Sequence, residues 1–197
     1  MSRKKQIEHT ATALFKAKGF SATSMRDLAN ALGIEAASIY SHIRSKEEIL
    51  QRVCFRMAEE FFEAMDAAEA TGATSTDKLR NAVSAHVQVL TKNTEASAVF
   101  LHEWRHLSEP YLSEFLALRD LYEGHFRQII KSGAESGEFA VPDEKFAVLT
   151  ILSALNWLPT WFRPEGKLQP AEIANTLSDM LLNGLRAPAR AMADGKP

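Results

Sequence analysis

Cysteine is nearly absent from this sequence of 197 residues, which contains only Cys54. A single cysteine excludes an intrachain disulfide, so the sequence does not require an oxidising compartment. The sequence also lacks a Cys-x-x-Cys pair, a glycine-rich phosphate loop and a Gly-x-Ser-x-Gly motif, which argues against common redox, nucleotide-binding and serine-hydrolase sites. We expect Cys54 to be a buried, unreactive thiol, with redox sensing as the alternative interpretation.

Long apolar runs are missing as well. The longest apolar stretch, residues 146–159, is shorter than the ~20 residues of a membrane-spanning helix and is interrupted by Thr150, Ser153 and Asn156. The basic residues 2–5 are followed by a helical pattern rather than by the apolar segment of a signal peptide. We therefore expect a cytoplasmic protein with no membrane partner and no cofactor.

The net charge is only −2, but the charges are unevenly distributed along the chain. Residues 1–52 contain nine Lys and Arg against five Asp and Glu, a net charge of +4, whereas the remaining residues contain fourteen against twenty, a net charge of −6. A basic segment attached to an acidic body indicates a local anionic partner, and nucleic acid is the first candidate. The hydrophobic fraction of 46% is that of a folded globular protein.

The apolar pattern is helical nearly throughout, and no segment alternates for long enough to predict a strand. Apolar spacing, capping residues and Gly or Pro breaks predict helices over residues 2–18, 24–32 and 36–43, a long helix from residue 45, and further helices near residues 77–92, 95–107, 110–132, 143–158 and 171–186. The fold class is therefore all-α. We expect a three-helix head over residues 1–48, a larger helical body over residues 49–187 and a flexible tail over residues 188–197.

Residues 24–43 have the pattern of a helix-turn-helix, in which two short helices are joined by a tight turn. Ala29 is small enough for the second helix to cross closely, and Gly33 allows the left-handed backbone of the turn. Apolar residues fall where the two helices must bury surface: Leu28, Leu32, Ile34 and Ile39. The pattern leaves a set of mostly small or polar residues free to face a DNA major groove: Ala36, Ala37, Ser38, Tyr40, Ser41 and His42.

The run TATALFKAKGFSATSMRDLANALGIEAASIYSHIRSKEEIL, residues 10–50, resembles the TetR family of regulators in both order and spacing. It departs from the family pattern at Ile43, where Phe is usual, and at Glu35-Ala36, where Ser followed by a small or basic residue is common. The resemblance implies a homodimer that binds palindromic double-stranded operator DNA. It also implies a repressor that a small-molecule effector releases, with activation as the alternative.

The resemblance further implies a role in DNA binding for individual residues. Phosphate contacts are implied for Thr23, Ser24, Arg26 and Lys46. Base contacts are implied for Ala36, Ala37 and Ser38, and backbone contacts for Tyr40 and His42. A basic arm on the flanking backbone or minor groove is implied for Arg3, Lys4 and Lys5. Phosphate contacts position such a protein, whereas base contacts specify the sequence. For each residue taken alone, an ordinary surface position remains the competing interpretation.

The segment His102-Glu103-Trp104-Arg105-His106 fits the H-E-x-x-H motif, which on a helix places two zinc-binding His on one face beside a catalytic Glu. The extended metallopeptidase motif is missing its Gly and its third His, because Glu109 and Leu112 occupy those positions. We therefore expect no metal and no enzymatic activity, and we keep a zinc metallopeptidase as the disfavoured alternative.

The body combines aromatic side chains with cationic and polar ones at positions suited to a cavity between helices. The predicted ligand-binding residues are His102, Trp104, Arg105, Arg119, Tyr122, Phe126, Asn156 and Trp157. The segments 101–105 and 156–164 look like the branch of the TetR family that senses acyl-CoA compounds, which implies an acyl-CoA thioester as effector. A lipophilic cation or drug is the alternative, for which Glu103 and Glu123 remain available, and a plain aromatic core is a third. TetR relatives pair through the last two long helices, which implies the same interface here.

Overall fold

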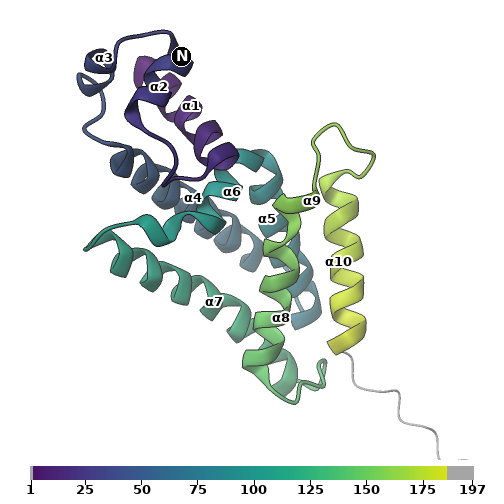
Figure 1. The fold of residues 1–197 in the computed structure, drawn as a ribbon. Coiled ribbons are helices and arrows are strands. Elements are labelled where there is room, and N and C mark those ends of the chain that lie inside the picture. Colours follow the sequence, from purple (N-terminus) through teal and green to yellow (C-terminus); the bar gives the residue numbers. More distant parts are fainter. Residues whose placement is uncertain (1, 186–197) are drawn as a thin grey trace, which may run out of the picture.

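The computed structural model describes residues 2–185, and the regular elements within this range are helices (Figure 1). The head consists of α1 (Arg3–Lys18), α2 (Met25–Leu32) and α3 (Ala36–Tyr40). The body consists of α4 (Lys46–Glu69), α5 (Ser75–Lys92), α6 (Thr94–His102), the 3-10 helix η1 (Trp104–His106), α7 (Tyr111–Glu135), α8 (Glu144–Asn156), α9 (Leu158–Trp161) and α10 (Pro170–Leu185). The predicted all-α class is confirmed. The predicted tail, residues 188–197, lies outside the described residues.

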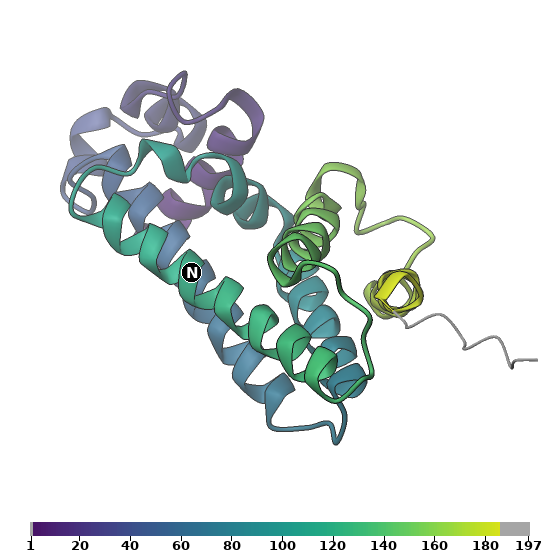
Figure 2. The ribbon, with the colours of Figure 1, turned by 90° about the horizontal axis from the view of Figure 1, so that it is seen from below.

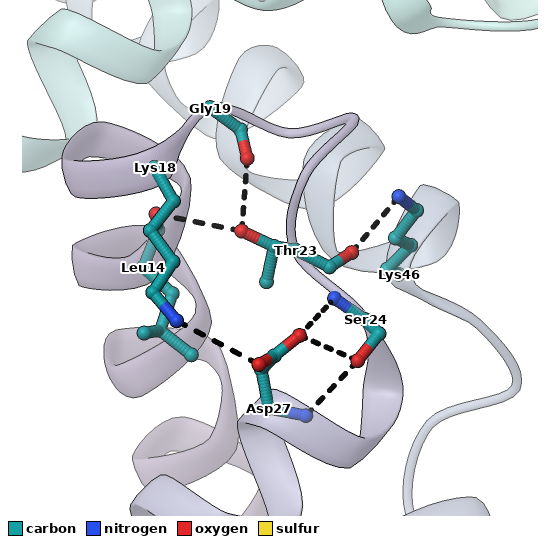
Figure 3. Close-up of polar contacts among 7 residues, drawn as sticks. All are labelled: Leu14, Lys18, Gly19, Thr23, Ser24, Asp27 and Lys46. Atoms are coloured by element: carbon teal, nitrogen blue, oxygen red, sulfur yellow. Dashed lines mark hydrogen bonds and ion pairs between the residues drawn. The ribbon is translucent and has the colours of Figure 1, made fainter.

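The helix starts of the head follow the capping residues of the sequence. Ser24 Oγ accepts a hydrogen bond from the backbone N–H of Asp27 at 3.1 Å, and the Asp27 carboxylate accepts one from the N–H of Ser24 at 2.8 Å (Figure 3). These bonds form the predicted capping box. The Ser24 hydroxyl also donates to the Asp27 carboxylate at 2.5 Å, and this bond, together with the one from the Ser24 N–H, holds the pKa of Asp27 below its usual value. Ser45 caps α4 in the predicted way, since its Oγ accepts from the N–H of Glu48 at 3.3 Å.

A carboxylate distant in sequence caps the start of α5. The two oxygens of Glu138 accept hydrogen bonds from the backbone N–H groups of Ser75 and Thr76, at 3.0 and 2.9 Å. These donors have no partner within their own helix, and the helix dipole favours a negative charge at this end. The pKa of Glu138 is lowered to about 2, and the largest contribution comes from the hydrogen bond that the N–H of Thr76 donates.

Two predicted helices are shorter or divided in the structure. The third helix ends at Tyr40 rather than at residue 43, and a tight turn follows in which Ser41 Oγ donates to the Ser38 carbonyl at 2.8 Å. The helix predicted over residues 95–107 ends at His102 and is followed by the separate 3-10 turn η1. Proline explains a further break near residue 157, because Pro159 lacks the N–H that would continue α8.

One hydrophobic core joins the head to the body. Helix α4 extends from the head along the body and packs against α5, α6 and α7, while α1 also packs against α6 (Figure 1). Helix α10 packs on α5 at one side of the body, where Figure 2 shows it nearly end-on beside α8.

Within this core, Cys54 is completely buried, and burial raises the pKa of its thiol to about 12. The prediction of a buried Cys54 is confirmed, and such a pKa makes its thiol unreactive at neutral pH. None of the helices in residues 2–185 combines the length and apolar character needed to cross a membrane.

Candidate DNA interface and effector cavity

The α2–α3 pair has the geometry of a helix-turn-helix. Gly33 ends α2 in the left-handed region at φ 64°, where a residue with a Cβ would be strained. The N–H of Ile34 then donates to the carbonyl of Ala29 at 3.1 Å and closes the turn. Leu28, Ala29 and Ile39 are buried, so the two helices are fixed to each other by their apolar faces.

The outer face of α3 and of the turn after it is exposed. Ala37, Ser38, Ser41 and His42 are exposed, and Tyr40 has 54% of its surface exposed. A large aromatic side chain at this exposure can reach a base edge or a phosphate. Ala36 differs from this set, because it is half-buried and packs against the hydrophobic core. A direct base contact is therefore better supported for the other predicted residues than for Ala36.

Basic side chains surround this outer face. Arg3, Lys5 and Arg26 are exposed, Lys4 is half-buried, and Ser24 presents its hydroxyl at the start of α2. No carboxylate within residues 2–185 forms an ion pair with any of these cations. Arg44, in the turn between α3 and α4, is a further exposed cation that the sequence prediction omitted. A basic residue directly after a recognition helix is a signal that could have identified it.

The side chains of two residues predicted to bind phosphate form hydrogen bonds to backbone carbonyls of the head (Figure 3). Thr23 is only 2% exposed, and its Oγ1 donates to the carbonyl of Gly19 at 2.8 Å. The Thr23 hydroxyl is buried and already bonded, which argues against the predicted phosphate contact of its side chain. The ammonium group of Lys46 donates to the carbonyls of Phe20 and Thr23, both at 2.9 Å, and lies 4.3 Å from the centroid of the Phe20 ring.

The body contains a cavity of about 290 Å³. It lies among α4, α5, α6, η1, α7 and α8, and its walls include the aromatic residues Phe61, Phe62, Phe100, Trp104, Phe115 and Tyr122 and the polar residues His86, Arg119, Asp120, Glu123 and Asn156. Four predicted ligand-binding residues therefore come together at this cavity: Trp104, Arg119, Tyr122 and Asn156. The volume is at the lower end of small-molecule sites, for which roughly 300–1,000 Å³ is typical.

The other four predicted ligand-binding residues do not line the cavity. His102 is exposed at the end of α6, where the helix stops. Phe126 is completely buried in the core beside Tyr122, at a centroid distance of 5.8 Å. Trp157 follows the end of α8 and is 64% exposed on the outside of the body. Arg105 is exposed and contacts the cavity only through the ring of Trp104.

Two guanidinium groups meet at Trp104. The Cζ atoms of Arg105 and Arg119 each lie 4.6 Å from the centroid of its indole ring. Burial lowers the pKa of Arg119, and the neighbouring charge of Arg105 lowers it further. Neither guanidinium forms an ion pair with a carboxylate in the described part of the chain. Glu123, which also lines the cavity, pairs with Arg127 instead. The carboxylates of Asp120 and Glu123, which line the cavity, raise the pKa of Arg119 from a longer distance. The edge of the cavity therefore carries two guanidinium groups that form no close ion pair in the described part of the chain.

A buried polar group forms another part of the cavity wall. His86 is completely enclosed, and its Nδ1 lies 3.0 Å from the Tyr122 hydroxyl while its Nε2 lies 3.2 Å from Asn156 Oδ1. Burial lowers the pKa of His86 to about 4, so the imidazole is neutral at pH 7, and burial raises the pKa of Tyr122. The sequence prediction missed His86. The signal was a single histidine within the apolar stripe of the helix predicted near residues 77–92.

The H-E-x-x-H residues link the body to the head. Because α6 ends at His102, the motif does not lie on one continuous helix as zinc binding would require. The Glu103 carboxylate instead accepts a hydrogen bond from the N–H of Phe20 at 3.1 Å, and the His106 ring stacks on the Phe20 ring at 5.2 Å. Within residues 2–185, no cluster of three or more His, Cys, Asp or Glu is placed to hold a metal ion.

Comparison with known proteins gives matches to both parts of the chain. The family model "Bacterial regulatory proteins, tetR family" matches residues 7–53, and the model "Tetracyclin repressor-like, C-terminal domain" matches residues 72–185. The HTH-type transcriptional repressor KstR2 of Rhodococcus jostii is 27% identical over 192 residues, which cover 94% of this chain and 92% of that protein.

Solved structures share the same fold. The TetR family regulator PfmR from Thermus thermophilus is 35% identical and superposes with a TM-score of 0.81, over 92% of this chain and all of that chain. AibR, solved in complex with isovaleryl coenzyme A and operator DNA, is 24% identical with a TM-score of 0.80, over 92% of this chain and 98% of that one. With a helix-turn-helix head and a matching C-terminal domain, the chain belongs to the TetR family of DNA-binding transcription regulators.

Proposed function

We propose that this regulator represses transcription by binding palindromic operator DNA as a homodimer, and that an acyl-CoA thioester releases it. The observation that carries the effector assignment is the pair of guanidinium groups, neither in a close ion pair, on the Trp104 ring at the edge of an aromatic cavity. Repression agrees with the relative KstR2, which is a transcriptional repressor. Since DNA is the partner, the protein would act in the cytoplasm.

The head supports DNA binding through its free outer face. The exposed residues of α3 would enter the major groove, and the cations of the N-terminal arm and of Arg26 would contact phosphates on either side. Such contacts release counterions, so affinity for the operator should fall as salt rises. Ser24 would bind a phosphate at the N-terminus of α2, where backbone N–H groups favour an anion.

Apolar exposure on the body supports a homodimer. Phe146 and Leu149 on α8 and Trp157 directly after its end are exposed, with Phe146 at 71%. Met180 on α10 is 69% exposed, and α10 lies beside α8 in both views (Figures 1 and 2). Large apolar side chains gathered on one side commonly mark a protein interface. A two-fold contact here would place two heads on successive turns of DNA.

The cavity supports an effector with an apolar part and an anionic part. A compact acyl group would fill the aromatic space, and the phosphates of coenzyme A would meet Arg119 in the cavity wall and Arg105 beside it. The AibR complex contains a ligand of the same class, isovaleryl coenzyme A. A lipophilic cation is disfavoured, because it would approach two guanidinium groups. Of the two carboxylates in the cavity wall, Glu123 is paired with Arg127, and Asp120 lies next to Arg119 in the sequence and acts on its charge.

Trp104 and the residues next to it in the sequence contact both the cavity and the head. The Trp104 ring lines the cavity, while its neighbours Glu103 and His106 hold Phe20 in the loop between α1 and α2. Lys46, the first residue of α4, binds the same loop. An effector that displaces Trp104 would therefore move the contacts that orient the head, which is a route from ligand binding to release of DNA.

A competition assay tests the proposal. A labelled operator from the region upstream of the gene is bound by the protein and then titrated with hexanoyl-CoA, with free CoA, with hexanoate or with a cationic dye. The thioester should release the operator at a lower concentration than either of its halves, since each half makes only part of the contacts. The variant Arg119→Gln should raise the required concentration about 10-fold or more. The exposed Lys131→Gln on the same helix is the matched control. Release by the dye and by no thioester would reject the effector assignment.

A further inference from the structure

The wall of the effector cavity contains a hydrogen-bonded group from three different helices, in which His86 is buried and Tyr122 and Asn156 are half-buried. Aromatic rings surround it, and the centroid of Phe61 lies 4.7 Å from that of His86. A polar group in such surroundings is costly unless it is fully satisfied, so a buried histidine that only fills space would be better replaced by an apolar residue.

Counting donors and acceptors shows what this group offers to the cavity. A neutral imidazole has one donor and one acceptor. If Nε2–H donates to Asn156 Oδ1, then Nδ1 accepts from the Tyr122 hydroxyl, and both N–H bonds of the Asn156 amide remain for another partner. The Asn156 side chain makes no other hydrogen bond within residues 2–185, and none of the buried side-chain polar atoms there is without a partner. The amide nitrogen is therefore open to the cavity that Asn156 lines.

The reverse assignment of the amide gives the same result. With its oxygen and nitrogen exchanged, Asn156 donates to Nε2, Nδ1–H donates to the Tyr122 oxygen, and the Tyr122 hydroxyl is then free to donate. Both arrangements leave at least one uncharged donor on a side chain that lines the cavity. The imidazole is neutral at pH 7, because burial lowers its pKa to about 4.

From this geometry we infer that Asn156 and Tyr122, held by His86, bind an uncharged carbonyl oxygen of the effector and determine its specificity. This inference rests on the acyl-CoA proposal and adds to it the group within the acyl part that the cavity recognises. A neutral donor in apolar surroundings binds a carbonyl well and does not compensate the desolvation of a carboxylate. The carbonyl belongs either to the thioester itself or to an oxo group along the acyl chain.

Three ligands separate these two sources: hexanoyl-CoA, its thioether S-hexyl-CoA, which lacks the carbonyl, and 5-oxohexanoyl-CoA. Binding is measured by calorimetry on the full-length protein. Recognition of the thioester predicts that hexanoyl-CoA binds about 10-fold more tightly than S-hexyl-CoA. Recognition of an oxo group instead predicts the same ratio between 5-oxohexanoyl-CoA and hexanoyl-CoA.

The variants Asn156→Leu and Tyr122→Phe should reduce whichever ratio is found to between one and three, while binding of the ligand without the recognised oxygen changes little. Leu152→Ala is the matched control, because Leu152 lines the same cavity from the same helix and its loss should weaken all three ligands alike. The ratio compares two ligands on the same protein, so a general loss of stability in a variant weakens both and leaves the ratio unchanged. Equal binding of all three ligands to the unchanged protein, or an unchanged ratio in both variants, would overturn the inference and leave the acyl-CoA proposal intact. Binding of no CoA ligand would overturn both.

Discussion

The protein should lose stability in mild acid because of His86. Its pKa is about 4 in the folded chain and 6.5 in the unfolded one, so between these values only the unfolded state takes up the proton. The stability that comes from keeping His86 neutral is therefore complete above pH 6.5 and falls as the pH is lowered towards 4. Each pH unit in this interval costs about 1.4 kcal/mol, so pH 5 should cost about 2 kcal/mol relative to pH 7.

Urea unfolding followed by tryptophan fluorescence at pH 7 and pH 5 measures this loss. The variant His86→Gln retains donor and acceptor atoms but does not titrate. Other groups that titrate in this range contribute alike to both proteins and cancel in the difference. The unchanged protein should lose about 2 kcal/mol more than the variant between the two pH values. Equal losses in the two proteins would show that His86 does not stay neutral in the folded state, which would refute the reasoning.

Four further changes have defined outcomes. Tyr40→Ala should weaken operator binding in a gel shift at least several-fold and leave the thermal unfolding midpoint unchanged, because the side chain is exposed. Glu103→Ala should preserve effector binding by calorimetry but impair release of DNA, because the bond to the Phe20 N–H is lost. Trp157→Asp should give a monomer in light scattering. Glu138→Gln should lower stability at pH 7, and urea titrations should show the difference shrinking from pH 4.5 towards 2, where the folded-state carboxylate of the unchanged protein also becomes protonated.

The head could be predicted closely from the sequence because its determinants are local. The capping box of Ser24 and Asp27, the left-handed Gly33 and the buried Ile39 all act within a few residues of each other. The sequence did not predict that the Thr23 hydroxyl bonds to the carbonyl of Gly19, because the path of this turn depends on how α1 and α2 are placed.

The cavity is harder to predict, because its polar group is assembled from three helices. His86, Tyr122 and Asn156 lie far apart in the chain, and no spacing rule connects them. The prediction for Trp157 fails for a related reason. A helical stripe shows that one face is apolar, but it does not show whether that face meets the core, a ligand or a second copy of the chain. In the structure, the placement of α8 and α10 leaves Trp157 exposed on the surface, so it meets neither the core nor the cavity.

The most direct test of the account is one fluorescence-anisotropy experiment with a labelled palindrome from the promoter of the gene. The protein should bind it as a dimer, more tightly than a scrambled duplex, with affinity that falls as salt rises. Addition of hexanoyl-CoA should then return the anisotropy to that of free DNA, and free CoA at the same concentration should not. A complex that forms equally well on the scrambled duplex, or one that no acyl-CoA releases, would contradict the account.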